Sequence, residues 1–120
     1  MILLPAGKTR TSEPMVSIRG ASRSQRCLAF NSALSLHALK DVDYIAVDLH
    51  DGGLTFFPCE SSTYKDTPAH RLIKDGGANT VGRAIYLPTS VLTEDIAPTG
   101  RYAATLARTK FTIRFPKPKR

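Results

Sequence analysis

The predicted fold rests on one stretch, Gly82-Arg83-Ala84-Ile85-Tyr86-Leu87-Pro88-Thr89-Ser90-Val91-Leu92. Residues 83–87 alternate in a pattern that is typical of a strand. Pro88 ends this strand, because proline has no backbone N–H to donate to a sheet, and the run that follows can form a helical turn. Two further strands, at 100–106 and 110–115, are predicted as a hairpin. The order is therefore strand, short helical run and hairpin.

The same order occurs earlier in the chain. Residues 26–34 align with residues 83–91 without a gap, so that Arg26 falls on Arg83. We interpret the two stretches as a degenerate internal repeat, whose period is the separation of these two arginines, 83 minus 26, or 57. Identity between the copies is low, and chance similarity is the alternative.

The first copy contains the elements that the repeat requires. Alternation predicts strands at 15–19 and 25–30 on either side of a loop. Asn31 is a good N-cap for a short helix at 32–39. The segment 44–57 is predicted as a hairpin, because it contains an Asp-Gly turn between two alternating runs. Its first tyrosine aligns with the tyrosine of the final hairpin, with a one-residue difference.

Positive charge is concentrated at the two ends of the chain. The chain has 17 basic and 10 acidic residues, a net charge of +7. By segment, the net charge is +4 over 1–26, −4 over 27–100 and +7 over 101–120. Basic ends attract polyanions, because every phosphate that is neutralised releases condensed counterions. For the last five residues, 116–120, a role in solubility is the alternative.

The sequence lacks the common catalytic and metal-binding motifs. It contains no Gly-x-Ser-x-Gly, no His-Glu-x-x-His, no phosphate-binding loop with its lysine and no Cys-x-x-Cys. The three histidines, His37, His50 and His70, are scattered along the chain. We therefore expect no enzyme activity, no catalytic residue, no metal and no cofactor. The two cysteines, Cys27 and Cys59, are predicted to be reduced.

No apolar run approaches the roughly 20 residues that span a bilayer, and the apolar start of the chain is too short for a signal peptide. We expect a cytoplasmic protein that has no membrane partner.

The stretch from Gly82 to Leu92 resembles the conserved motif of the AbrB/MazE family of swapped-hairpin proteins. The match is Gly82-Arg83-x-Ile85-x-Leu87-Pro88-x-x-Val91, and residues 102–115 resemble the closing hairpin of that family. The first copy, 26–57, resembles it more weakly, because Asn31 replaces the proline and Gln25 the glycine. Together the copies cover most of the chain from 15 to 115.

The resemblance implies a mainly β fold, a swapped-hairpin β-barrel formed by two tandem AbrB-like repeats that each contain one short helix. Members of the family pair as dimers, since some 45 residues bury too little apolar surface alone. Two copies in one chain imply a monomeric pseudo-dimer, with a homodimer as the alternative. The implied organisation is a flexible basic arm (1–14), repeat 1 (15–57), a linker (58–70), repeat 2 (71–115) and a basic tail (116–120).

The resemblance also implies DNA binding, because members of the family present arginines from paired hairpins to the duplex. The implied function is that of a small transcriptional regulator that contacts the backbone of double-stranded DNA. Asp66 and Asp75 lie near the cations of the second copy in the sequence, so an alternative is a DNA-binding site formed by the first copy alone. The candidate DNA-binding residues are Arg19, Arg23, Arg26, Arg71, Lys74 and Arg83.

Two other functions remain open from the sequence. One is a protein-binding inhibitor or antitoxin-like module, in some cases virus-encoded, which would hold its protein partner with the arm or the tail. The other is a single-stranded nucleic-acid binder, which needs exposed aromatic side chains among basic ones. Tyr102, Phe111 and Phe115 lie near arginines, but alternation directs Phe111 and Phe115 into the core.

Overall fold

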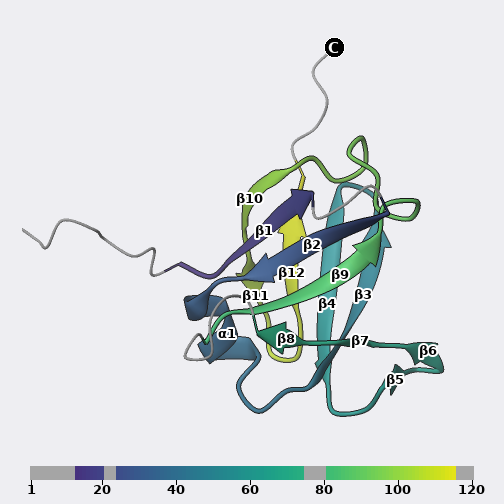
Figure 1. The fold of residues 1–120 in the computed structure, drawn as a ribbon. Helices are drawn as coiled ribbons and strands as arrows, with labels where there is room; N and C mark the ends of the chain where they lie inside the picture. The colour runs from purple at the N-terminus through teal and green to yellow at the C-terminus, as the bar shows by residue number, and fades with distance from the viewer. Residues whose placement is uncertain (1–12, 21–23, 75–80, 116–120) are drawn as a thin grey trace, which may run out of the picture.

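The computed structural model describes residues 13–20, 24–74 and 81–115, and these residues form a mainly β protein, as predicted (Figure 1). The first half contains β1 (Met15–Gly20), β2 (Gln25–Phe30), α1 (Ser32–Ala38), β3 (Tyr44–His50) and β4 (Gly53–Cys59). The middle contains four two-residue strands, β5 (Thr63–Tyr64), β6 (Thr67–Pro68), β7 (His70–Arg71) and β8 (Ile73–Lys74). The last part contains β9 (Arg83–Pro88), β10 (Gly100–Ala103), β11 (Thr105–Leu106) and β12 (Phe111–Arg114).

The strands form two five-stranded sheets and one small hairpin. Sheet A has the order β10-β1-β2-β9-β8, sheet B has the order β11-β12-β4-β3-β7, and β5 pairs with β6. Within the described residues, the two large sheets are not closed into the predicted barrel. The chain passes from one sheet to the other at Leu72 and at Ala104. The backbone N–H groups of these residues bond Asp43 O and Pro14 O, which extends the β3–β7 and β1–β10 registers by one residue pair each. The predicted linker, 58–70, contains the β5–β6 hairpin.

Three phenylalanines hold the two sheets together. The ring of Phe30, on sheet A, meets the rings of Phe56 and Phe111, on sheet B, edge to face, at centroid distances of 5.4 and 5.7 Å. Phe56 and Phe111 stack on each other at 4.9 Å. All three side chains are fully buried, and each aromatic pair of this kind adds about 0.5–1.5 kcal/mol beyond the burial of its area. The core therefore lies between the two sheets.

The two central strand pairs that join the halves of the chain each contain one residue pair with the same sequence separation. β2 runs antiparallel to β9 with Leu28 opposite Ile85. β4 runs antiparallel to β12 with Thr55 opposite Thr112. Both differences, 85 minus 28 and 112 minus 55, equal the period of 57 that the sequence alignment indicates. Each of these pairs is thus centred on residues that the alignment makes equivalent.

The outer pairs follow the same offset with one adjustment. Val16 lies opposite Tyr102 in the β1–β10 pair, and Ile45 lies opposite His70 in the β3–β7 pair. The residue number rises by 57 from Ile45 to Tyr102 (102 minus 45) but only by 54 from Val16 to His70 (70 minus 16). The chain between β7 and β9 is therefore longer than the chain between β1 and β2 by 57 minus 54, or 3, residues. The register also corrects the alignment, since Ile45, and not Tyr44, occupies the position of Tyr102.

The first-copy helix forms where it was predicted. Asn31 Oδ1 accepts the N-cap hydrogen bond from Leu34 N at 2.9 Å and a second bond from Met15 N at 3.1 Å. Asn31 Nδ2 donates to Glu13 O at 2.8 Å. The residue that replaces the proline of the motif therefore both caps α1 and fastens it to the start of β1.

The predicted helical run after Pro88 is wrong, because residues 89–99 form only turns. Leu92 N bonds Pro88 O and Ala97 N bonds Thr93 O, but these bonds do not propagate into a helix. A side chain from the other half of the chain binds the carbonyl groups that a longer helix would need, as described below. Among the described residues, only the first copy thus has the helix that was expected of both.

Candidate nucleic-acid interface

Arg26, a predicted DNA-binding residue, is buried and structural. Only 3% of its surface is exposed, and its Nη1 donates to the carbonyl oxygens of Leu92, Thr93 and Ala97. Its Nη2 donates to Glu94 Oε2 at 2.9 Å and to Thr99 Oγ1 at 3.0 Å. A DNA phosphate cannot reach this guanidinium, and its assignment to the DNA surface is therefore wrong. Arg26 instead shapes the connection between β9 and β10.

The same network lowers the pKa of Glu94 below its ordinary value of 4.5. The main causes are hydrogen bonds from the backbone N–H and the hydroxyl of Thr99, and the charge of Arg26 adds a smaller effect. A lowered carboxyl pKa contributes stability that is complete above the ordinary pKa and is lost as pH falls through the folded-state pKa.

We therefore expect Glu94→Gln to lose stability less steeply than the parent protein as the pH falls below about 4.5. Urea unfolding midpoints measured by far-UV circular dichroism from neutral pH to about pH 3 would test this. Equal acid slopes in the two proteins would contradict it.

Arg19 lies on the outer face of sheet A next to an arginine from the far end of the chain. Ser17 on β1 is opposite Arg101 on β10, so Arg19, two residues along β1, is the diagonal neighbour of Arg101 on the same face. Such neighbours are separated by about 7–8 Å, and both arginines are exposed. We call this pair the β1–β10 strip.

The described outward positions around the strip carry no acidic side chain. Outward and inward positions follow from the strand registers, with Val16 and Ile18 of β1 facing the core between the sheets. Three of the outward positions, Cys27, Ala29 and Ala84, are themselves buried. Across the described strands of sheet A, the outward residues are Met15, Ser17, Arg19, Gln25, Cys27, Ala29, Ile73, Ala84, Tyr86, Pro88, Arg101 and Ala103. None of them is acidic.

The other predicted DNA-binding residues are not gathered on this face. Arg71 lies opposite Tyr44, at an outward position of sheet B. Lys74 lies opposite Arg83 at inward positions of sheet A, and Arg83 Nη1 donates to two neighbouring carbonyls, Val81 O and Gly82 O, each at 3.2 Å. Arg23 falls outside the described residues. The structure therefore brings none of the other described candidates, Arg26, Arg71, Lys74 and Arg83, beside Arg19.

A second surface combines aromatic rings with lysines. Phe57 on β4 stacks on Tyr64 of β5 with centroids 5.2 Å apart and planes 19° apart. Lys110 Nζ lies 5.9 Å from the centroid of Phe57, and Lys65 Nζ lies 5.6 Å from that of Tyr64. Both rings are half-buried. We call the two rings, with these two lysines, the Phe57–Tyr64 platform.

The platform borders a hollow of about 320 Å³. Its lining includes both rings of the platform, the exposed carboxylate of Asp48 and the polar side chain of Thr67. The hollow thus combines two flat rings, the ammonium group of Lys65 and the carboxylate of Asp48, which can accept hydrogen bonds.

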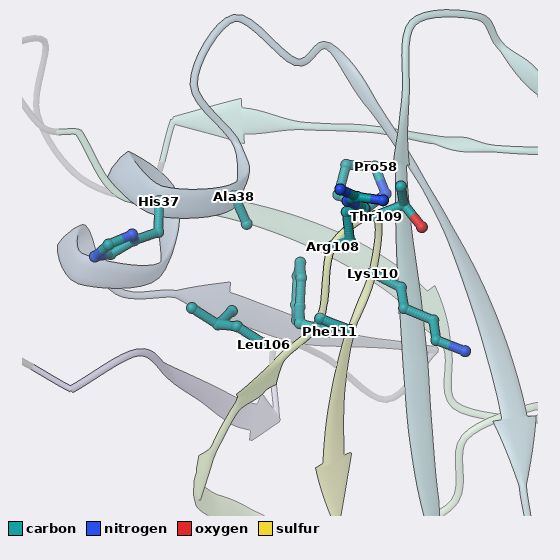
Figure 2. A pocket seen from close by; sticks show the side chains of 9 residues that line it. His37, Ala38, Pro58, Leu106, Arg108, Thr109, Lys110 and Phe111 are labelled. Atoms are coloured by element: carbon teal, nitrogen blue, oxygen red, sulfur yellow. The ribbon is translucent and has the colours of Figure 1, made fainter.

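A pocket of about 410 Å³ lies between α1 and the β11–β12 hairpin. Figure 2 shows His37 and Ala38 on the helix at one side and the hairpin at the other. Pro58, Leu106 and Phe111 are among its apolar lining residues, and Arg108 and Lys110 supply positive charge at the hairpin. We call it the hairpin pocket. Because Lys110 lines the pocket and also contacts the ring of Phe57, the pocket and the platform adjoin.

The described residues contain no group of three or more His, Cys, Asp or Glu side chains that could hold a metal ion. Within the same residues, no helix has the length and apolar character needed to cross a membrane. Cys27 is buried and Cys59 half-buried, and neither takes part in a disulfide in the described part of the chain.

Comparison of the chain with protein-family models, curated protein sequences and solved structures found no match. The resemblance of Gly82–Val91 to the AbrB/MazE motif thus stays a prediction from the sequence.

Sequence reasoning identified Arg19 of the β1–β10 strip, but it missed Arg101 and the two rings of the platform. Arg101 was counted only as part of a basic end, although its alternation with Tyr102 indicated an outward position. Phe57 ended a predicted hairpin, and Tyr64 was assigned to a linker. No local signal in the sequence could show that Tyr64 folds back onto Phe57, because that contact depends on the β5–β6 turn.

Proposed function

We propose that this protein is a small DNA-binding regulator that contacts the duplex backbone through the β1–β10 strip. The observation that carries the proposal is the pairing of β1 with β10, which places Arg101 beside Arg19 on a face with no outward acidic residue in the described strands. Arginines on strands suit phosphate contacts, because the guanidinium offers several N–H donors in a fixed plane.

We further propose that the chain is a tandem swapped-hairpin pair of the AbrB type. The common sequence offset of the β2–β9 and β4–β12 registers supports this reading, since a two-fold relation between the halves requires it. The DNA surface would then be one-sided, because the second-copy position equivalent to Arg19 is occupied by Ile73, which pairs with Ala84 as Arg19 pairs with Cys27.

The double substitution Arg19→Ser plus Arg101→Ser should weaken duplex binding about tenfold at low salt. It should also reduce the slope of log affinity against log salt by about 2, because roughly 0.9 counterion is released per phosphate contact. Fluorescence anisotropy with a labelled duplex of random sequence, titrated at several salt concentrations, would measure both quantities.

The matched control is Lys40→Ser plus Arg114→Ser, which removes the same charge from two exposed residues outside the strip. It should keep most of the affinity. If the parent protein fails to bind duplex at low salt, or if both double variants lose affinity equally, the strip is not the DNA surface.

A further inference from the structure

We infer that the Phe57–Tyr64 platform binds an unpaired base of a single-stranded nucleic acid. This goes beyond the proposed function, because the platform lies on sheet B and on the β5–β6 hairpin, whereas the β1–β10 strip lies on sheet A. Neither surface needs the other in order to act. Figure 1 shows the β5–β6 hairpin projecting beyond the two large sheets, where a long ligand can pass it.

The first argument concerns the geometry of the rings. A tight turn sets the position of Tyr64, since Tyr64 pairs with Thr67 and both intervening residues, Lys65 and Asp66, have positive φ of 49° and 66°. This is the conformation of a two-residue type I′ hairpin, whose twist matches that of its strands. The turn therefore presents a rigid ring, which costs little conformational entropy when a second flat group stacks on it.

The second argument concerns charge. An ammonium group lies close to each ring, Lys110 by Phe57 and Lys65 by Tyr64. Every nucleotide of a single strand joins a flat base to an anionic phosphate, so a ligand of this kind can use rings and lysines at once. An uncharged peptide could use only the rings. Lys110 also belongs to the hairpin pocket, where Arg108 adds a second cation for the next phosphate along the strand.

The third argument concerns the edge of the base. Asp48 lines the same hollow as both rings, and its carboxylate can only accept hydrogen bonds while it is ionised. The exocyclic amine of cytosine is a donor that a carboxylate recognises, whereas thymine presents a carbonyl oxygen at that position. The hollow, at about 320 Å³, also lies within the usual size range of small-molecule pockets. A base in a duplex would not expose its face, so the ligand is single-stranded.

The test measures anisotropy of labelled dC12, dT12 and a 12-base-pair duplex with the folded full chain. The parent protein should bind dC12 about fivefold tighter than dT12. Tyr64→Leu should weaken both single strands about tenfold, as expected for the loss of one stacked base. Asp48→Asn should abolish the preference for dC12. The control is Tyr86→Leu, which makes the same change at an exposed tyrosine on sheet A and should leave single-strand binding unchanged.

The inference is overturned if Tyr64→Leu, shown to be folded by circular dichroism, binds dC12 as the parent does, or if the parent binds no single strand at low salt. If Tyr64→Leu does not fold, Lys65→Ala decides the question, because it changes an exposed side chain at the turn and should weaken single-strand binding severalfold. Arg19→Ser plus Arg101→Ser separates the two proposals, since it should weaken only the duplex. If the parent protein does not bind duplex DNA, the proposed function is refuted, whereas this inference is unaffected.

Discussion

Arg26→Met should lower the free energy of unfolding by about 3 kcal/mol, the largest loss that we expect from removing one charged side chain. Methionine fills a similar volume but donates no hydrogen bond, so the carbonyls of Leu92 and Ala97 lose a buried donor. Each buried acceptor without a partner costs about 1–3 kcal/mol. Glu94 is mostly exposed, so the loss of its ion pair with Arg26 adds little to this cost.

The aligned residue of the second copy supplies the control. The Arg83 guanidinium donates to the carbonyls of Val81 and Gly82, which lie close to it in the chain, and the side chain is only half-buried. Arg83→Met should cost less than about 1 kcal/mol, because water can replace its bonds. Urea unfolding followed by far-UV circular dichroism gives both values. Equal losses at the two arginines would show that burial of Arg26 is not what makes it important.

Gly53→Ala should destabilise the protein by about 3 kcal/mol, because the central β4–β12 pair leaves no room for a side chain at this position. A Cβ on Gly53 would lie 2.3 Å from Ile113 O, which is a backbone atom and cannot rotate away. On the β3 side the nearest atom is Cε1 of the His50 ring, at 3.1 Å, so the strain falls mainly on the β4–β12 pair. Forcing extra atoms into a tightly packed site costs about 1–3 kcal/mol and occasionally more.

Gly20→Ala is the matched control, since a Cβ there would meet no atom within 4 Å. It should change the free energy of unfolding by less than about 0.5 kcal/mol. Thermal unfolding of both variants, followed by circular dichroism, compares the two glycines directly. A Gly53→Ala protein as stable as the Gly20→Ala protein would mean that β4 and β12 are less closely paired than described.

Local patterns predicted most of the strands and the only helix of the described residues. Alternating apolar residues identified β1, β2 and β9, and Asn31 was correctly read as the cap of α1. The sequence also contained the period that the registers of the central strands follow. These features can be predicted from one sequence, because each depends on neighbouring residues and on which side of a strand faces the core.

Features that depend on contacts between distant residues could not be predicted in the same way. The run after Pro88 has the composition of a helical turn, but its carbonyls are bonded by Arg26, which belongs to the other half of the chain. The same contact buries Arg26, which the local sequence pattern had indicated to be a surface arginine. The position of Arg19 beside a β10 residue was equally hidden, because the order of strands in sheet A is not the order in the chain.

The pairing of each half with the other determines what happens while the chain is being synthesised. β1 needs β10 and β4 needs β12, so the chain from 60 to 114 must be added before the edge of β4 is covered. At about 5–20 residues per second, a ribosome needs roughly 3–11 s to add that length. For these seconds the emerging first half exposes unpaired strand edges and the apolar side of Phe56, which are features that chaperones bind and that drive aggregation. Slower translation should therefore lower the yield of folded protein, whereas a holding chaperone should raise it.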